Sequence, residues 1–564
     1  MIMTKKLFIL FAFAAVFASC SDKVYEEINT DPTKAAAMNP AQQLSYAALQ
    51  MYGDMNYVDV HRLYTYAFTQ HLMGCWNTTN YGGQHRMDDN EMSRPWNNLY
   101  TAAIRNLTDG IEQSTGDSNL VNTQAAMRIF RVYVAGLLTD YYGDVPFSEA
   151  GLANISGNSR PKYDKQEDLY NAFFAELKEA VKSFDIQQEA ITSDPIFGGD
   201  IEAWKKFAAS LRMRYAMRLS DVNSTLAQKE FTEVLNEKSY MTSAADDACV
   251  KHMNISYSFG QESYKDFRGN ALAKYFYGND PVNNPTYICQ TLWEQLYNNK
   301  DPRTNRLCRF YVDNFLSIST GDGRIDITDA VMDRQAADPK TVSLIAPGEF
   351  SWDNWPVYDA SAVAGSALAA KMEEIVKAHP DYKPEKDPRW LKPKLANNFL
   401  RSDNPGILMT YAEVCFLRAE AAVLWSTGDV AKDMYEAGIR AAMNVLSDYY
   451  GCDPVTDTEF AAYIAQPDIA FTSGKEKEQI NTQAWILHFH NPAEAWANLR
   501  RSDYPALTPP KADGKNPLID GNDIPVRFCY PLKEETYNNG AYQEAIGRVT
   551  GTYDWHARLW WDVK

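Results

Sequence analysis

Apolar residues recur every three or four positions over long stretches of this 564-residue chain, and this spacing limits its possible folds more than any other feature. The pattern is clearest in residues 168–184 and returns in residues 96–111, 127–138 and 204–215. Each segment has one apolar face, which must pack against a neighbour to leave water. The spacing therefore predicts a mainly α-helical protein.

Residues 411–425 and 430–446 form a predicted helical hairpin, with Gly428 placed to end the first helix. Small residues such as Ala419 suit close helix contacts and indicate tetratricopeptide-like helical hairpins, although the strict consensus of that repeat is absent. Between about residues 243 and 398, Gly, Asn, Pro and aromatic residues interrupt the helical spacing. Long irregular segments of a compact protein commonly carry function. We therefore expect the ligand-binding site in this loop-rich part.

The first twenty residues have the pattern of an export signal that ends in a lipid-modified cysteine. Lys5 and Lys6 precede an apolar run of about twelve residues, which fits a signal peptide and is too short to span a bilayer. Small residues then lead to Cys20, although Phe17 stands where such motifs usually have leucine. An ordinary cleaved signal is the alternative. We predict a signal peptide over residues 1–19, a lipid anchor at Cys20 with an N-terminal arm over 20–40, and a single domain over 41–564.

The charge and the cysteines of the chain argue against several kinds of partner. Loss of residues 1–19 removes two lysines and lowers the net charge from −18 to −20. Such an acidic protein is not expected to bind nucleic acid or an anionic bilayer face, so membrane contact should occur through the lipid anchor only. Seven cysteines besides Cys20 form no CxxC pair, which gives no sign of a zinc or redox site. Most should be small buried residues.

No catalytic motif with a known mechanism occurs in the sequence. HExxH, GxSxG and phosphate-binding GxxxxGK patterns are absent, and His488 and His490 lie in an apolar stretch that suits the core. Residues 320–329 resemble part of a calcium loop, but Ile318 has no oxygen for the first ligand position, so a polar turn is favoured. We predict no catalytic residue, metal or cofactor. Glycosidase carboxylates can lie far apart in sequence, which leaves a hydrolase as an alternative.

Short motifs occur in a fixed order along nearly the whole mature chain. They are residues 29–32, 96–100, 141–150, 204–214, 301–303, 412–413, 418–421, 494–496, 500–505, 524–531 and 559–562. In number and order they resemble the SusD/RagB outer-membrane lipoproteins of the Bacteroidetes, especially the SusD-like branch described as starch-binding associating with the outer membrane. The resemblance implies a mainly α SusD-like fold, with tetratricopeptide-like helical hairpins and a loop-rich ligand-binding half.

The resemblance also implies a function. SusD-like proteins are surface nutrient-binding lipoproteins without catalytic activity, and they act as lids over a SusC-like TonB-dependent transporter in the outer membrane. The expected ligand is an oligosaccharide or polysaccharide, which the protein captures and delivers to that transporter. A peptide-binding SusD/RagB-type protein is a close alternative, and a secreted glycan hydrolase is an alternative from a different class.

Two aromatic segments without helical spacing are the candidate sugar-binding site. The first, residues 76–83, contributes Trp76, Asn77 and Tyr81, and the second, residues 350–358, contributes Trp352, Asn354 and Trp355. A flat aromatic ring can cover the apolar C–H face of a pyranose while neighbouring amides bond its hydroxyls. Tryptophans in loops can instead pin a loop to its scaffold, and that alternative stays open.

Other conspicuous side chains are predicted to belong to the scaffold. Trp96, Trp204, Trp485 and Trp496 lie on amphipathic helices and are expected in the core. Three arginines of one predicted helix should form ion pairs with acids such as Glu413 or Glu420. These arginines are Arg212, Arg214 and Arg218.

Overall fold

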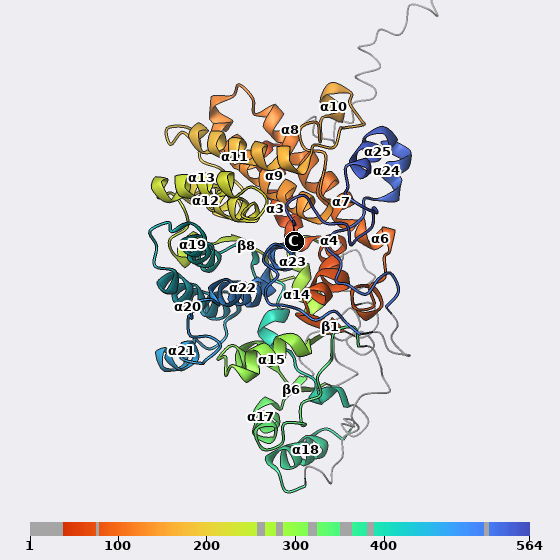
Figure 1. Ribbon diagram of the computed structural model, residues 1–564, viewed down its shortest axis with the longest axis vertical. Coiled ribbons are helices and arrows are strands. Elements are labelled where there is room, and N and C mark those ends of the chain that lie inside the picture. The colour runs from red at the N-terminus through yellow and green to blue at the C-terminus, as the bar shows by residue number, and fades with distance from the viewer. Residues whose placement is uncertain are drawn as a thin grey trace, which may run out of the picture.

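The computed structural model describes residues 38–74, 78–255, 266–277, 286–313, 324–349, 364–380, 388–511 and 518–563. Figure 1 shows helices throughout, with α8, α9 and α11 towards one end of the molecule and α15, α17 and α18 towards the other. The chain end near residue 563 lies close to the middle of this view. None of the helices in these ranges is both long and apolar enough to cross a membrane.

The first part of the chain is almost entirely helical. Its helices are α3 (Pro40–Gly53), α4 (Met55–Val60), α5 (Tyr66–Phe68), α6 (Asp89–Met92), α7 (Arg94–Asn98), α8 (Arg105–Gln113), α9 (Val121–Tyr142), α10 (Ala153–Ser156), α11 (Gln166–Ser183), α12 (Ile201–Arg218) and α13 (Ser224–Glu237). The predicted helix over 96–111 is interrupted by the π-helical turn η3 (Leu99–Ile104) between α7 and α8.

The second part combines helices with short strands. The helices are α14 (Ala271–Tyr277), α15 (Gln290–Asn298), α16 (Thr304–Leu307), α17 (Thr328–Ala337), α18 (Ala367–Ala378), α19 (Tyr411–Trp425), α20 (Ala431–Tyr450), α21 (Asp457–Ile464), α22 (Glu476–Leu487), α23 (Pro492–Ser502), α24 (Leu532–Tyr537) and α25 (Asn539–Gly547). The described strands form antiparallel pairs: β1 (Leu72–Gly74) with β3 (Thr286–Ile288), β2 (Ala248–Val250) with β8 (Gly406–Met409), β4 (Cys308–Arg309) with β7 (Lys394–Leu395), and β5 (Tyr311–Asp313) with β6 (Arg324–Asp326).

The predicted hairpin is present as α19 and α20, which pack against each other. Its first helix ends differently from the prediction. Ser426 takes the left-handed conformation at the end of α19 (φ 54°) and donates its backbone N–H to Ala422, whereas Gly428 lies two residues further on with φ 96°. The chain therefore uses two consecutive tight bends, because the five residues 426–430 must reverse its direction, and the glycine serves the second bend.

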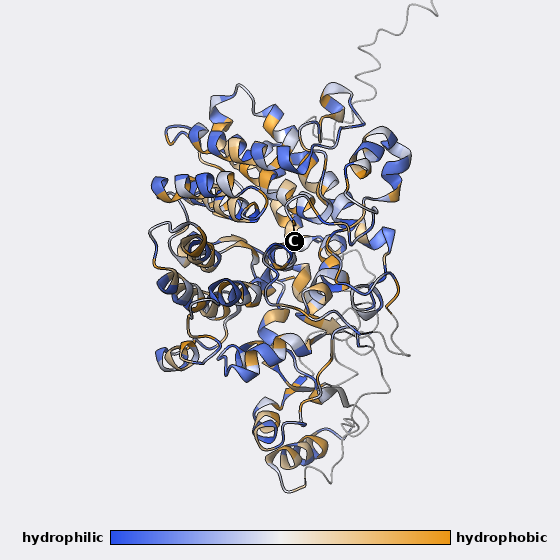
Figure 2. Ribbon diagram, viewed as in Figure 1, coloured by the Kyte–Doolittle hydropathy of each residue, from blue (hydrophilic) through white to orange (hydrophobic). Residues whose placement is uncertain are grey.

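The tryptophans predicted to lie in the core are buried. Trp204 and Trp496 have no exposed surface, Trp485 has 1% and Trp96 has 6%. They belong to one cluster of buried side chains that runs from α3 to the C-terminal segment. By contrast, the helices α13 and α15 at the edge of the view carry many hydrophilic residues (Figure 2). The free cysteines Cys249, Cys289, Cys308 and Cys415 are buried as well.

Ion pairs between distant helices are buried in this scaffold. The Arg214 guanidinium of α12 binds both carboxylate oxygens of Glu413 on α19, at 2.6 and 2.7 Å. Arg218 lies four residues after Arg214 on α12. It contacts Glu494 of α23 at 2.7 Å and Asp140 of α9 at 3.2 Å. The prediction that these arginines pair with acids is correct, and Glu413 is one of the acids that it named.

The other acid that the prediction named, Glu420, does not pair with an arginine of α12, and the partners of Arg212 are acids that the prediction did not name. Arg212 points to α13, where it contacts Glu230, Glu233 and Glu237 at 2.8–3.2 Å. Glu420 binds Arg501 of α23 through both carboxylate oxygens at 2.7 and 2.9 Å. These arginines therefore hold the helices together and are not exposed to a ligand.

Candidate functional site

The first aromatic segment is described from Thr78 onward, and Trp76 and Asn77 lie outside the described residues. Tyr81 is in a π-helical turn, η2 (Thr79–Gly83), which packs against the π-helical turn η1 (His61–Thr65). The ring of Tyr81 is half-buried, with its centroid 5.9 Å from that of Tyr64. Burial, reinforced by the charge of Glu91, raises the pKa of the Tyr81 hydroxyl, so this group stays protonated and able to donate a hydrogen bond.

The second aromatic segment follows directly after a turn that contacts the first. Trp352, Asn354 and Trp355 themselves lie outside the described residues. In the preceding turn, Gly348 has φ 75°, and a Cβ atom there would lie 2.8 Å from the carbonyl oxygen of Gly83 and 2.7 Å from Pro510 Cβ. No side chain fits in so small a space, so glycine lets the two backbones touch. The end of the first segment, at Gly83, therefore lies beside the turn that precedes the second segment in the chain.

Hydrogen bonds between strands and turns fix this arrangement. Beyond the β1–β3 pair, the backbone N–H of Cys289 donates to His71 at 3.0 Å, and that of Gln290 donates to Ile345 at 2.9 Å. Gln70 adds a link to a third segment, because its side-chain amide donates to the Thr508 carbonyl at 2.7 Å. Chain segments that are far apart in the sequence thus meet at one place beside β1.

The end of the first aromatic segment is held from the other side by residues 518–521. The backbone N–H groups of Ile519 and Asp520 donate to the carbonyls of Gln84 and His85, both at 2.9 Å. Burial lowers the pKa of His85 to about 4, and its Nδ1 lies 3.2 Å from the Gly521 carbonyl. Neutral His85 is therefore a structural contact at neutral pH and adds no charge to the candidate site.

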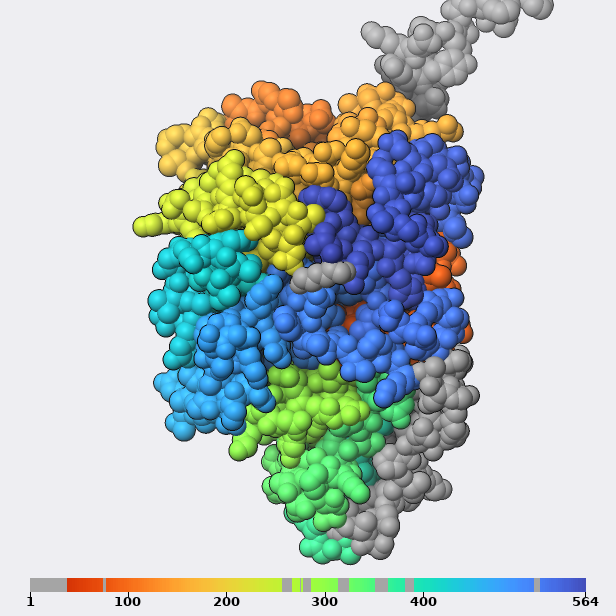
Figure 3. Space-filling view, in the orientation of Figure 1, coloured from red at the N-terminus to blue at the C-terminus, as the bar shows by residue number. Residues whose placement is uncertain are grey.

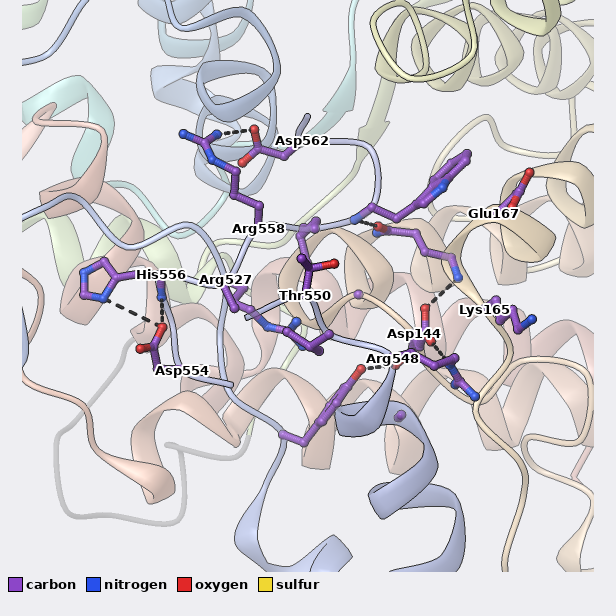
Figure 4. Close-up of a pocket in the computed structure, with 18 of the residues that line it drawn as sticks. Asp144, Lys165, Glu167, Arg527, Arg548, Thr550, Asp554, His556, Arg558 and Asp562 are labelled. Atoms are coloured by element: carbon purple, nitrogen blue, oxygen red, sulfur yellow. Dashed lines mark hydrogen bonds and ion pairs between the residues drawn. The ribbon is translucent and has the colours of Figure 1, made fainter. Parts of the chain in front are cut away.

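A separate cavity of about 800 Å³ lies where α9 ends, α11 begins and the C-terminal segment passes (Figure 4). Asp144 joins these elements. Its Oδ1 accepts the backbone N–H of Gln166 at 2.8 Å, its Oδ2 accepts Arg548 Nε at 2.5 Å, and its carbonyl accepts the Tyr530 hydroxyl at 2.8 Å. Gln166 in turn accepts the backbone N–H of Trp560 at 2.9 Å.

The sequence motifs at 141–150, 524–531 and 559–562 meet at this cavity, but their spacing gave no sign that they enclose a space. Asp144 and Tyr530 are hundreds of residues apart, and no local periodicity links them. Gly143 ends α9 with φ 93°, and the Leu559 side chain lies 3.3 Å from where its Cβ would be. Only the folded chain reveals the cavity, because each wall comes from a different part of the sequence.

One buried group among the described residues combines metal-binding side chains: Glu413, His488 and Glu494, whose ligand atoms lie within 4.8 Å of one another. Both carboxylates already bind arginines, Glu413 through Arg214 and Glu494 through Arg218. Burial lowers the pKa of His488 despite these two carboxylates, so the imidazole is neutral. With both negative charges balanced by arginine, the group acts as part of the scaffold.

Comparison with known proteins identifies the family. A family model described as starch-binding associating with outer membrane, SusD-like_2, matches residues 32–321 and 377–531. The chain belongs to this SusD-like family. A solved structure described as Bacteroidetes AC2a SusD-like is 70% identical, covers 93% of this chain and 100% of its own, and has a TM-score of 0.89.

More distant solved structures share the same architecture. One described as a chitin-binding protein is 31% identical with a TM-score of 0.73, and the match covers 93% of this chain and all of that one. A SusD homologue from Bacteroides uniformis ATCC 8492, at 21% identity and a TM-score of 0.68 over 93% of this chain and 99% of that one, shows the same fold. No curated protein sequence matches the chain.

The SusD-like helical fold expected from the sequence motifs is thus confirmed. Membership of the SusD-like family also places the chain among glycan-binding, nutrient-binding proteins associated with the outer membrane. Proteins of this family bind their ligands and are not a catalytic class.

Proposed function

We propose that this SusD-like protein is held at the cell surface by a lipid on Cys20, captures oligosaccharides and delivers them to a SusC-like TonB-dependent transporter. The observation that supports the proposed location of the binding site is the contact between Gly348 and Gly83. It supports a single site built from the two aromatic segments, because the second begins two residues after Gly348 and the first ends at Gly83. Trp76, Tyr81, Trp352 and Trp355 would then supply rings for sugar faces, while Asn77 and Asn354 bond hydroxyls.

Chitin oligosaccharides are the first ligands to test, because a 31% identical structure is described as a chitin-binding protein. Starch fragments come second, from the description of the family. Titration calorimetry of the purified protein with chitohexaose, maltoheptaose and a peptide mixture separates the alternatives. Binding of either saccharide supports the proposal, and binding of peptides alone contradicts it in favour of the peptide-binding alternative.

The hydrolase alternative is tested in the same samples. Chromatography after long incubation with each saccharide should show the starting chain length only, because a binding protein leaves its ligand intact. Shorter products that disappear when the protein is omitted would contradict the proposal. A preparation of damaged protein is recognised because it also fails to bind the saccharides in calorimetry.

The transporter partner is tested with the native membrane. We expect the full-length protein, extracted in mild detergent from its own cells, to co-purify with an outer-membrane TonB-dependent transporter. Extraction without that partner, from cells shown to express it, would contradict the delivery step while leaving glycan binding in place.

A further inference from the structure

We infer that the cavity around Asp144 and Trp560 is a second saccharide-binding pocket, with no lining residue in common with the two aromatic segments. The inference rests on the proposed function, because it assumes that the protein handles glycans. Gly143 and Asp144, which follow α9, and residues from α11, α25 and the C-terminal segment line a space of about 800 Å³. That volume falls within the range of about 300–1,000 Å³ that small-ligand sites have.

The lining has a buried floor and an exposed rim, as expected of a pocket that a ligand enters from solvent. Gln166, Tyr530 and Leu559 are buried in the floor, whereas Lys165 and Glu167 are exposed at the rim. Figure 4 shows Thr550 at the centre of the view, with Arg527 on one side, Asp144, Lys165 and Glu167 on the other, and Arg558 above. Donors and acceptors are therefore available on several sides of one ligand.

The charges of the lining favour a neutral ligand. Four cationic side chains are matched by four acidic ones: Lys165, Arg527, Arg548 and Arg558, against Asp144, Glu167, Asp554 and Asp562. Arg548 binds Asp144 and Arg558 binds Asp562, both at 2.5 Å. A phosphate or sulfate would meet no excess of positive charge, and a wholly apolar ligand would leave these charged groups without water.

Arg527 does not alter this balance, although it is 2% exposed and has no acidic partner within the described residues. Its guanidinium donates to the carbonyl oxygens of Tyr142 and Phe528. Tyr142 is the last residue of α9, where the helix dipole places partial negative charge. The helix end therefore stabilises the arginine without a counter-ion.

Two features of the C-terminal segment point to a sugar. Trp560 lines the cavity and is half-buried, so part of its indole ring can receive the apolar face of a pyranose. Asp562 also lines the cavity, is 4% exposed, and its Oδ1 accepts a hydrogen bond from Arg558 Nη1 at 2.5 Å. This bond holds the Arg558 side chain, which is 48% exposed, at the cavity, where its remaining N–H groups can donate to sugar hydroxyls.

Titration of the full-length detergent-solubilised protein with chitohexaose and with maltoheptaose tests this pocket. We expect one of these saccharides to bind at two sites in the wild-type protein. Trp560→Ala should weaken the second site roughly tenfold, the size of one lost stacking contact. Trp560→Phe should retain most of that affinity because it keeps a ring. Tyr537→Ala, which removes a 68% exposed ring outside the lining, should change neither site.

The outcomes separate this inference from the proposed function. Saccharide binding at one site only, with Trp560→Ala equal to wild type, overturns the second pocket and leaves the proposed function intact. Absence of binding by either saccharide overturns both. If Trp560→Ala lowers the melting temperature, a crystal of the wild-type protein soaked in the bound saccharide decides: sugar density beside Trp560 supports the pocket, and an empty cavity overturns it.

Discussion

Arg214 and Glu413, which are 199 residues apart in the sequence, form a buried bidentate ion pair between α12 and α19, with N–O distances of 2.6 and 2.7 Å. The same guanidinium donates to the Leu408 carbonyl at 2.8 Å, at the strand β8 that leads into α19. This one side chain thus fixes the position of the α19–α20 hairpin against the N-terminal helices. Figure 3 shows that these parts of the surface, yellow-green for α12–α13 and cyan for α19, adjoin each other.

Glu413→Gln should lower the free energy of unfolding by about 3–5 kcal/mol, because it leaves the buried Arg214 guanidinium without its counter-charge. The matched control is Asp457→Asn, which breaks an ion pair of Arg440 at the surface, where Asp457 is fully exposed. Solvent and salt screen that pair, and its loss should cost less than about 1 kcal/mol. Urea unfolding followed by circular dichroism measures both. An equal decrease in the free energy of unfolding of the two variants would contradict a structural role for the buried Arg214–Glu413 pair.

Asp247 should make the protein less stable as the pH rises towards neutrality. Burial raises the pKa of this carboxyl to about 7 from its usual 3.8, although it accepts hydrogen bonds from the Tyr411 N–H and the Tyr449 hydroxyl. Because the folded state binds this proton more tightly than the unfolded state, the proton contributes its full stability below pH 3.8. This contribution is lost as the pH rises to about 7. We therefore expect Asp247→Asn to gain stability relative to wild type between about pH 4 and pH 7.

The adjacent acid supplies a control of opposite sign. Burial alone would raise the pKa of Asp246, but its bond to Lys206 and those to Thr242 outweigh it and lower the pKa. Its carboxylate therefore adds stability above its usual pKa of 3.8 and loses it as the pH falls through the lowered value. Asp246→Asn should be less stable than wild type at pH 7. Urea unfolding midpoints of both variants are measured at pH 4, 5.5 and 7. If they move in the same direction relative to wild type, the opposite pKa shifts of Asp247 and Asp246 are refuted.

Trp204→Ala should destabilise the protein by about 3–5 kcal/mol without changing ligand affinity. The indole is fully buried, and its N–H donates to Asp194 at 2.8 Å. Trp425→Ala is the matched control, because that ring is only half-buried at the end of α19 and should cost less. Thermal melting gives the stabilities, and calorimetry well below the melting temperature gives the affinities. Loss of affinity in stable Trp204→Ala would place this residue in the site.

The helices were predictable from the sequence because each one buries a single face, and that requirement leaves a period in the chain. Residues 411–425 are a helix with the same bounds in the structure, and the predicted helix over 168–184 lies within two residues of α11. The π-helical turn η3 was not predictable, because it covers only six residues, which is too short a stretch to show a period different from that of an α-helix.

Contacts between distant elements were harder to predict than the elements. The sequence could say that Arg214 needs an acid, but Glu413 and Glu420 lie on the same helix and only the helix packing assigns Glu413 to Arg214 and Glu420 to Arg501. The cavity at Asp144 was missed for the same reason. For the aromatic segments, the sequence indicated ring chemistry in two places, and the Gly348–Gly83 contact is the structural link between them.

Cys20→Ser should release the protein from membranes. Cys20 follows the predicted signal directly, and acyl chains on this residue would bury enough methylene groups for stable anchoring. The variant should neither incorporate a palmitate analogue nor sediment with membranes from cells that lack the transporter. Cys249→Ser, at a buried cysteine, serves as the control and should keep both properties. Incorporation of the label into Cys20→Ser would contradict the anchor.

The last prediction concerns the aromatic segments as one sugar platform. Trp355→Ala should weaken glycan binding by about 1–3 kcal/mol, extrapolated from the loss of buried aromatic residues at interfaces. Trp76→Ala should have an effect of the same size if its ring contacts the same sugar chain. Tyr81→Phe keeps the half-buried ring and removes only a hydroxyl, so it should lose less.

The double variant of Trp76 and Trp355 decides whether the two segments share one ligand. Rings that hold the same sugar chain should show a coupling energy of about 0.5–3 kcal/mol in a double-mutant cycle, because loss of one ring frees the sugar to shift on the other. Independent rings should give additive losses within about 0.5 kcal/mol. Calorimetry on four proteins, all checked for unchanged melting temperature, measures the cycle. Additive losses would contradict a shared platform even where each single variant loses affinity, since the Gly348–Gly83 contact lies at the end of the first segment and two residues before the second.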